Sequence, residues 1–413
     1  MKEFLHPLNF YLIYKMLRIV FYSLLLAISH IASSQAQSTS IKASQAARQV
    51  NVVSKIAAPN IEATAWTLME MNSGWVVAGN NAEQPLPPAS ITKLMSNYVI
   101  YEKIIANEIS LQDEVSISEK AWRAEGSRMF ANVNSKVELQ HLLKSTVIQS
   151  GNDESIALAE HAAGTEAVFA SFMNKAAQDI GLRNSHFVNS TGLPADGHSM
   201  SANDIATLSA AIIREHPSFY EWYSEKVYTH NEITQYNRNK LLWKDSSVDG
   251  LKTGHTNAAG YCLVGSAARN GQRWIAVVLG SKDQATREAQ VLSLLNYAFA
   301  AYQPLSILDE QGGVMSADVY YGEVDQIRLQ PLNPVNIVVP QGRNDDVQID
   351  YQISPYFEAP LEVGQSVGVA SLSLDGKLLM DVPLVAMSSI EKGGLWKRFK
   401  DSIRLSWRNF RAD

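Results

Sequence analysis

Cysteine is almost absent from this chain of 413 residues, which contains only Cys262. An intrachain disulfide and a site built from several thiolates are therefore excluded, and we predict neither a metal nor a cofactor. Cys262 lies in the apolar run Gly260–Ser266. This setting favours a buried, inert thiol over a reactive thiol of a cytosolic enzyme.

Charge is also scarce, because charged residues make up 18% of the chain and the formal net charge is only −6. This balance argues against a general nucleic-acid binder, and the 46% of hydrophobic residues indicates a globular chain rather than a disordered one. The length exceeds what one hydrophobic core usually organises, so we expect two folded domains with accessory segments at the ends.

The apolar run near the N-terminus, residues 19–28, is too short to span a bilayer comfortably. It follows two cations and precedes small residues that suit signal-peptidase cleavage after Ala36. We therefore predict a signal peptide over residues 1–36 and a loose leader over 37–54. An uncleaved anchor that also uses residues 8–14 is the alternative, and either reading exports the body of the protein to the periplasm.

The C-terminal segment 391–413 is predicted to be an amphipathic helix, and the Gly393-Gly394 pair near its start is expected to act as a swivel. Its apolar residues recur at spacings of three and four: Trp396, Phe399, Ile403, Trp407 and Phe410. Its cations occupy other positions: Lys397, Arg398, Lys400, Arg404, Arg408 and Arg411. Indole rings and cations favour the anionic headgroup region, so we predict a helix lying on the inner-membrane surface. A helix packed on the protein's own surface is the alternative.

Between the ends, the pattern changes once. Over residues 55–303, strand-like runs such as Trp274–Leu279 are mixed with helical stretches such as residues 153–180, which predicts a mixed α/β domain. Over residues 304–390, short β-branched runs separated by Pro, Gly and Asn predict a small all-β domain. This second domain gathers no obvious site.

Three short motifs occur in order in the first domain: Ser90-Ile91-Thr92-Lys93, Ser150-Gly151-Asn152 and Lys252-Thr253-Gly254. Each alone is weak, and the ordered trio is the signal. After two prolines, Ser90 is expected in the first turn of a buried helix, where Lys93 shares its face. A lysine among apolar neighbours has a depressed pKa and accepts a proton, so Ser90 and Lys93 are the candidate nucleophile and base. A capping serine beside a surface lysine is the bland alternative.

The other two motifs supply the remaining chemistry. Gly151 is expected to let the chain turn so that Ser150 relays a proton and Asn152 bonds a peptide substrate. Lys252-Thr253-Gly254 is expected to open an edge strand, with Gly254 letting a ligand lie against the backbone and Lys252 and Thr253 meeting a terminal carboxylate. His255 is either a pH-sensitive neighbour or a donor of its backbone N–H to an oxyanion.

With these motifs, the chain resembles the low-molecular-mass penicillin-binding proteins that act as D-alanyl-D-alanine carboxypeptidases, of the penicillin-binding protein 5 and 6 type. Further segments carry the resemblance: Gly126–Phe130, Thr191–His198, Asn237–Asn239 and Val248–Thr256. It implies a β-lactamase/transpeptidase-like catalytic domain, removal of the terminal D-alanine from peptidoglycan stem pentapeptides, and covalent binding of β-lactams at Ser90. By position it also implies that Arg287, or less directly Arg238, binds the substrate carboxylate. Arg128 stands where a small or apolar residue is expected, which affects fine specificity.

Three other functions fit the sequence less well. A class A β-lactamase needs a loop glutamate to activate water, and no convincing E-x-x-x-N loop occurs in residues 160–200. A D,D-endopeptidase is chemically closer, but by resemblance the C-terminal helix accompanies carboxypeptidases. A catalytically idle peptidoglycan-binding scaffold is disfavoured because nucleophile, base and relay are all present.

Overall fold

The computed structural model describes residues 48–49, 56–308 and 315–412. The predicted signal peptide over residues 1–36 lies outside the described residues. So does the predicted leader over 37–54, except for Arg48–Gln49, which form a short strand.

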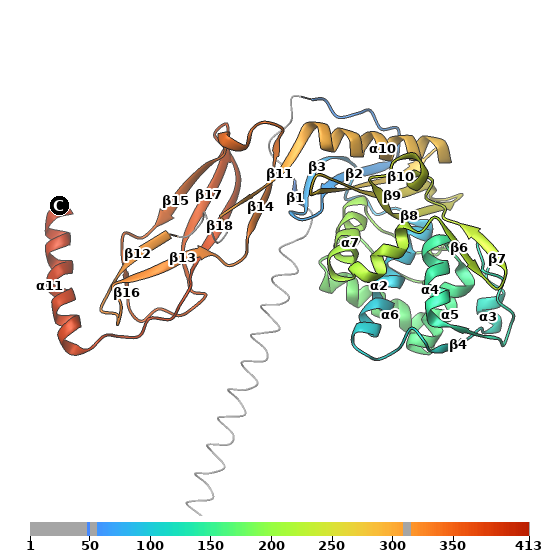
Figure 1. Ribbon diagram of the computed structural model, residues 1–413, viewed down its shortest axis with the longest axis horizontal. Coiled ribbons are helices and arrows are strands. Elements are labelled where there is room, and N and C mark those ends of the chain that lie inside the picture. The colour runs from blue at the N-terminus through green and yellow to red at the C-terminus, as the bar shows by residue number, and fades with distance from the viewer. Residues whose placement is uncertain (1–47, 50–55, 309–314, 413) are drawn as a thin grey trace, which may run out of the picture.

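A six-stranded sheet organises the first domain (Figure 1), in the order β1-β3-β2-β10-β9-β8. Only β1 and β3 run parallel, and the other neighbours are antiparallel. The strands are β1 (Arg48–Gln49), β2 (Ala65–Glu70), β3 (Trp75–Asn80), β8 (Val248–Thr256), β9 (Gly260–Arg269) and β10 (Gln272–Ser281). Successive side chains point to opposite faces, so in β10 Ile275 and Val277 enter one core whereas Trp274 and Ala276 enter the other.

Helices cover both faces of this sheet. The long helix α10 (Gln284–Ala301) packs on one face together with the short helix α9 (Leu241–Lys244), and most of the other helices form a lobe on the opposite face (Figure 1). The lobe contains η1 (Ala89–Thr92), α2 (Lys93–Ile105), α3 (Glu119–Trp122), α4 (Leu139–Ile148), α5 (Asn152–Ala163), α6 (Glu166–Asp179), α7 (Ala202–Glu215), α8 (Pro217–Tyr220) and η2 (Glu221–Ser224). Two hairpins complete it: β4 (Glu114–Ser116) with β5 (Lys136–Glu138), and β6 (Val227–His230) with β7 (Ile233–Tyr236).

The helical stretch predicted over residues 153–180 is interrupted once. Gly164, at φ 75°, ends α5, and the Thr165 side chain caps α6 by accepting from the backbone N–H of Val168. A glycine in the left-handed region followed by a capping threonine is a recognisable helix stop and start. The predicted helical stretch is therefore present as two helices, α5 and α6.

The second domain is all-β, as predicted. A six-stranded sheet has the order β15-β17-β18-β13-β12-β16, and β11 pairs with β14 beside it. The elements are β11 (Tyr302–Ile307), β12 (Met315–Tyr320), β13 (Gln326–Pro331), β14 (Val335–Pro340), η3 (Asn344–Asp346), β15 (Gln348–Ile353), β16 (Phe357–Glu358), β17 (Ser366–Leu374) and β18 (Lys377–Ala386). One apolar cluster runs from Trp274 of the first sheet to Val338 and Leu372, so the two domains share part of their core.

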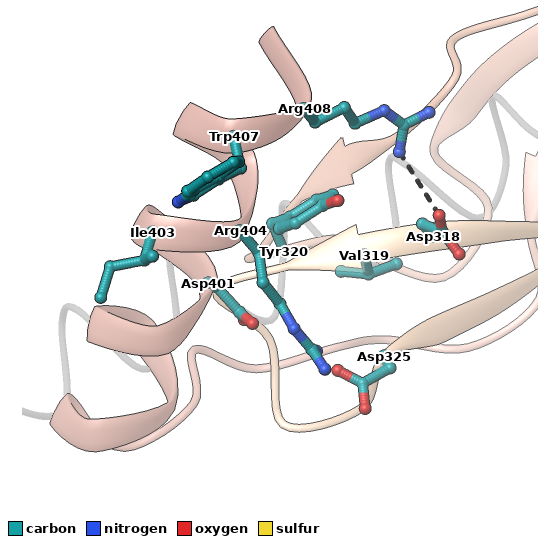
Figure 2. A pocket seen from close by; sticks show the side chains of 9 residues that line it. All are labelled: Asp318, Val319, Tyr320, Asp325, Asp401, Ile403, Arg404, Trp407 and Arg408. Carbon is teal, nitrogen blue, oxygen red and sulfur yellow. Dashed lines mark hydrogen bonds and ion pairs between the residues drawn. The ribbon is translucent and has the colours of Figure 1, made fainter. Parts of the chain in front are cut away.

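The C-terminal helix α11 (Leu395–Ala412) contacts the second domain through its polar side (Figure 2). The buried Asp401 carboxylate accepts from the backbone N–H of Tyr321 at 2.8 Å. Lys397 pairs with Asp325, and Arg408 pairs with Asp318. Leu405, one turn after Asp401, is also buried. The helix therefore lies on the protein through salt bridges, a buried hydrogen bond and one buried leucine, whereas the side that carries Trp396 and Trp407 is exposed.

The Gly393-Gly394 linker is only partly free. Gly393 donates its N–H to the carbonyl of Tyr321 at 2.9 Å, and a Cβ there would lie 2.7 Å from the carbonyl oxygen of Gly322. Gly394 has open space around it. The expected two-residue swivel is thus reduced to one residue.

Candidate active site

The turn before α2 brings the first motif together. Ala89 has φ 50°, and η1 carries Ser90 into the first residue of α2, which is Lys93. The Lys93 amine lies 3.2 Å from the Ser90 hydroxyl oxygen. The opening turn is 3₁₀ rather than α, but the three-residue spacing still places both groups side by side as predicted, because residues three apart nearly eclipse in such a turn.

Lys93 is completely buried, and its amine contacts three acceptors. Besides Ser90, it donates to Asn152 Oδ1 at 2.6 Å and to the carbonyl of Thr191 at 2.8 Å. Burial lowers the pKa of Lys93 to about 7, because the charged form loses its hydration, while the nearby Glu154 acts in the opposite direction. A lysine with such a pKa can exchange a proton at neutral pH.

The loop that holds Lys93 from the other side depends on Gly192. This residue has φ 82°, and a Cβ there would lie 1.9 Å from the carbonyl oxygen of Ala89. Asn189 stabilises the loop by accepting from the backbone N–H groups of Thr191 and Gly192. The Thr191–His198 segment thus has a structural role, because it places the carbonyl of Thr191 against the amine of Lys93.

The second motif turns at Ser150 rather than at the glycine. Ser150 has φ 69°, whereas Gly151 has an ordinary φ of −64°. Gly151 is needed for a different reason, because a Cβ there would lie 1.7 Å from a carboxylate oxygen of Glu154. The expectation that Gly151 makes the sharp turn was wrong. The Ser150 hydroxyl is buried and has no hydrogen-bond partner among the described residues, so it is available for a substrate.

Glu154 is a buried carboxyl directly beneath this turn. It accepts a hydrogen bond from the Ser145 hydroxyl at one oxygen, and its other oxygen has no hydrogen-bond partner within the described part of the chain. Burial raises the pKa of Glu154 well above its usual range, and the neighbouring Asp153 adds to the shift. No sequence motif marks this residue.

The third motif lies on β8, the edge strand of the sheet. It occupies the middle of β8 and does not open it, because the strand already begins at Val248. A Cβ on Gly254 would lie 2.9 Å from the carbonyl oxygen of Pro88, so this glycine lets β8 approach the Ser90 turn. We expected a ligand to lie against the backbone of Gly254, but in the structure the turn that carries Ser90 lies there instead.

Cations gather behind this strand. Burial lowers the pKa of Lys252 well below its usual range, and the positive charges of Lys93, Arg238 and Arg287 lower it further. Arg287 is also buried and donates to the carbonyl oxygens of Gly254 and Cys262. On the cavity side, such a cluster of cations suits an anionic group.

One cavity of about 270 Å³ joins these elements. It is lined by Ser90, Ser127, Ser150, Arg238, Lys240, Thr253, Gly254, His255, Tyr261, Gln284 and Arg287. The other candidates, Lys93, Asn152 and Lys252, are buried behind it. The His255 ring is exposed and stacks on Tyr261 with centroids 4.1 Å apart. No aspartate or glutamate is among the described residues that line this cavity.

Four lining residues were missed from the sequence: Ser127, Lys240, Tyr261 and Gln284. They come from separate segments, and no local pattern marks them. Cys262, in contrast, is fully buried as predicted, and burial raises the pKa of its thiol to about 11, which keeps it inert.

A serine hydroxyl beside a buried lysine, next to an unpaired serine and a cationic edge strand, defines an enzyme of the serine acyl-transfer class. Comparison with known proteins then gives the family. Residues 52–283 match the D-alanyl-D-alanine carboxypeptidase family, and residues 302–392 match the C-terminal domain of penicillin-binding protein 5.

Individual proteins agree with these matches. D-alanyl-D-alanine carboxypeptidase DacC of Escherichia coli K12 is 36% identical over 360 residues, which cover 85% of this chain and 90% of the relative. Penicillin-binding protein 5 from Haemophilus influenzae has a TM-score of 0.79 at 36% identity, covering 82% of this chain and all of that structure. Penicillin-binding protein D2 from Listeria monocytogenes, solved with ampicillin bound, has a TM-score of 0.55 at 29% identity over 58% of this chain.

The chain therefore belongs to the low-molecular-mass penicillin-binding proteins of the D-alanyl-D-alanine carboxypeptidase family, and it is a serine peptidase. The predicted fold class is also confirmed, with a β-lactamase/transpeptidase-like first domain, an all-β second domain and a C-terminal helix.

The Gly192 loop gives a testable prediction. Gly192→Ala should slow acylation by labelled penicillin by at least about tenfold, because the added carbon displaces the Ser90 turn and small misplacements at a reacting centre are costly. The matched control is Gly271→Ala, which has a similar φ of 77° but no atom within 4 Å of the new carbon. Equal slowing in the two variants would contradict the steric argument.

Proposed function

We propose that Ser90 is the nucleophile and Lys93 the general base of a D-alanyl-D-alanine carboxypeptidase reaction. The observation that carries this proposal is the buried Lys93 amine, 3.2 Å from the Ser90 oxygen, with a pKa lowered to about 7. In water a lysine is protonated at neutral pH and cannot accept a proton, whereas this amine can.

The substrate that suits the site is a peptidoglycan stem pentapeptide. Its backbone would lie along the edge strand β8, where main-chain hydrogen bonds hold an extended peptide. Its terminal carboxylate would meet Lys252, Thr253 and Arg287, with Arg238 and the neighbouring His255 close by at the cavity wall. A carboxylate would supply negative charge on the cavity side of this cationic cluster, and would raise the depressed pKa of Lys252.

The steps follow from these positions. Lys93 takes the Ser90 proton as Oγ attacks the carbonyl carbon of the penultimate D-alanine. Ser150 relays that proton to the departing amine, so free D-alanine leaves and an ester remains on Ser90. Water then attacks the ester, passes a proton to Lys93, and the Ser90 oxygen leaves and is reprotonated.

Asn152 has a second task besides substrate orientation. Its Oδ1 accepts from Lys93, and its Nδ2 donates to the carbonyl of Glu125 at 2.5 Å. Both ends of the amide are engaged before any substrate arrives. We infer that Asn152 fixes the lysine amine and meets the peptide only after the amine moves toward Ser90.

β-Lactams would acylate the same serine. Opening of the strained ring amide forms an ester with Ser90, and the amine that is released stays attached to the rest of the molecule. The ampicillin-bound relative from Listeria monocytogenes supports this inference. The lack of a carboxylate among the described lining residues disfavours the class A β-lactamase alternative, which requires a glutamate to activate water.

We also propose that α11 holds the protein on the periplasmic face of the inner membrane. Its Arg404 and Arg408 side chains extend toward the second domain, whereas Trp407 points away from it (Figure 2). Trp396 and Trp407 are 70% and 61% exposed. Exposed indoles on a basic helix favour the lipid headgroup region. None of the helices in the described ranges is long and apolar enough to cross a membrane.

The nucleophile can be tested by mass measurement. Full-length protein in detergent should gain one penicillin per chain at Ser90 and should release D-alanine from a D-Ala-D-Ala peptide. Ser90→Ala should do neither, whereas Ser116→Ala, at an exposed position of β4, should do both. An adduct in Ser90→Ala, or an adduct in the wild type without D-alanine release, would contradict the assignment.

The lysine can be tested by a pH profile. Log kcat/KM should rise with unit slope as the pH approaches about 7 and level off above it, because only neutral Lys93 accepts the proton. Glu154→Gln should move this rise to lower pH, since an ionised Glu154 favours the charged lysine. The control Glu119→Gln, at an exposed salt bridge with Arg123, should leave it in place. A rise that moves to higher pH in Glu154→Gln would overturn the coupling.

The membrane anchor can be tested by fractionation. Deletion of residues 395–413 should move the protein from the membrane fraction to the soluble periplasm. A Trp396→Ser, Trp407→Ser double variant should shift part of it while keeping every charge of the helix. Arg343→Ser is the control for the loss of a positive charge outside α11, because Arg343 forms a salt bridge with Asp375 in the second domain. This variant should stay in the membrane fraction. Unchanged fractionation of the deletion would contradict an anchoring role for α11.

A further inference from the structure

Three potential metal ligands converge at the far end of the catalytic helix. Glu102 lies on the last turns of α2, Glu215 is the last residue of α7, and His216 follows it. One ligand atom from each residue lies within 4.8 Å of the other two. The two helices are neighbours in the lobe (Figure 1), so the cluster joins elements far apart in the sequence.

His216 is the observation that points to a ligand. The residue is 1% exposed, and neither of its ring nitrogens makes a hydrogen bond within the described part of the chain. A buried imidazole without a hydrogen-bond partner is costly and calls for an explanation. Its Nε2 lies 3.2 Å from Glu102 Oε1, but not in the geometry of a hydrogen bond.

That separation suits two ligands of one ion. Zinc–ligand bonds of about 2.0–2.1 Å at a tetrahedral angle place two donor atoms about 3.3 Å apart. The ring itself is fixed, because Tyr98 packs edge-on against it with centroids 5.0 Å apart and Tyr101 lies at 5.4 Å. A rigid imidazole and two carboxylates that can close by side-chain rotation make a partly preformed site.

The surroundings supply the outer contacts that such sites use. The Tyr98 hydroxyl donates to Glu215 Oε2 at 2.7 Å and so orients that carboxylate. Burial, followed by the negative charge of Glu215 and Glu102, raises the pKa of Tyr98, which is a sign of concentrated negative charge. Arg214 pairs with Glu215 Oε1 at 3.0 Å and is the competing cation.

We propose that Glu102, Glu215 and His216 form a binding site for a borderline divalent cation of the zinc type, with water completing the coordination. One imidazole nitrogen and two carboxylates are a zinc ligand set, whereas calcium and magnesium prefer oxygen alone. The ion clamps the end of α2 to the end of α7. Glu102 is nine residues from Lys93, about 13 Å along the helix, so the site is separate from the catalytic cavity.

The site can be measured without any activity assay. Full-length protein in detergent, stripped with a chelator, should bind one Zn²⁺ in calorimetry, and Co²⁺ should give the visible absorption bands of a low-symmetry, protein-bound ion. Glu102→Gln and His216→Ala should each lower the Zn²⁺ affinity by about 10- to 100-fold. Zn²⁺ should raise the melting temperature of the wild type and not of these variants.

The controls separate this site from adventitious binding. His161→Ala removes another histidine that pairs with a carboxylate, Asp113, and should leave the Zn²⁺ affinity unchanged. If His216→Ala does not fold, Glu102→Gln decides, since its side chain is 48% exposed. No saturable Zn²⁺ binding, or equal affinity in Glu102→Gln and the wild type, would overturn the proposal. It does not rest on the proposed catalytic function.

Discussion

The buried amine of Lys93 is the group around which the first domain is arranged. An amine removed from water must be hydrogen-bonded, and its acceptors come from three separate segments: Ser90 on its own turn, Asn152 at the start of α5, and the Thr191 loop. Because these contacts must all be made at once, they fix α2, α5 and the loop relative to one another. The same contacts keep the amine within reach of the one acceptor that is not fully buried, the Ser90 hydroxyl.

The electrostatic cost of this arrangement is shared between two layers. On the cavity side, four cations repel one another, and this repulsion favours the neutral form of the two lysine amines until an anion binds. These cations are Lys93, Lys252, Arg238 and Arg287. On the side away from the cavity, the negative charge of Glu154 has the opposite effect on Lys93, while burial raises the pKa of Glu154 and so disfavours that charge. Each buried group therefore limits the charge of the next. A substrate carboxylate bound on the cavity side would raise the pKa of the lysine amines there without contacting Glu154. Substrate binding is thereby linked to the protonation of the site.

The sequence was sufficient wherever local geometry decides the contact. Three-residue spacing predicted that Lys93 meets Ser90, and the apolar run Trp274–Leu279 predicted the strand that is β10. It was insufficient where a contact joins distant segments. Nothing local shows that Gly192 lies against Ala89, or that Tyr261 and Gln284 line the cavity. The break at Gly164 differs, since the following Thr165 is a capping residue that local reasoning could have used.

Helix α11 reverses the usual burial of an amphipathic helix. Such a helix ordinarily packs its apolar side on its own protein, but here the buried residues are a carboxylate, Asp401, bonded to the backbone N–H of Tyr321, and a single leucine, Leu405. These two buried residues and the flanking salt bridges set which side faces outward, and the side left exposed carries Trp396 and Trp407. Because the second domain shares its apolar cluster with the first, the direction of that exposed side is coupled through packed elements to the catalytic lobe. Under the proposed anchoring, the all-β domain would be the spacer between the cleft and the membrane, because it contacts the first domain through an apolar cluster and α11 through mainly polar groups.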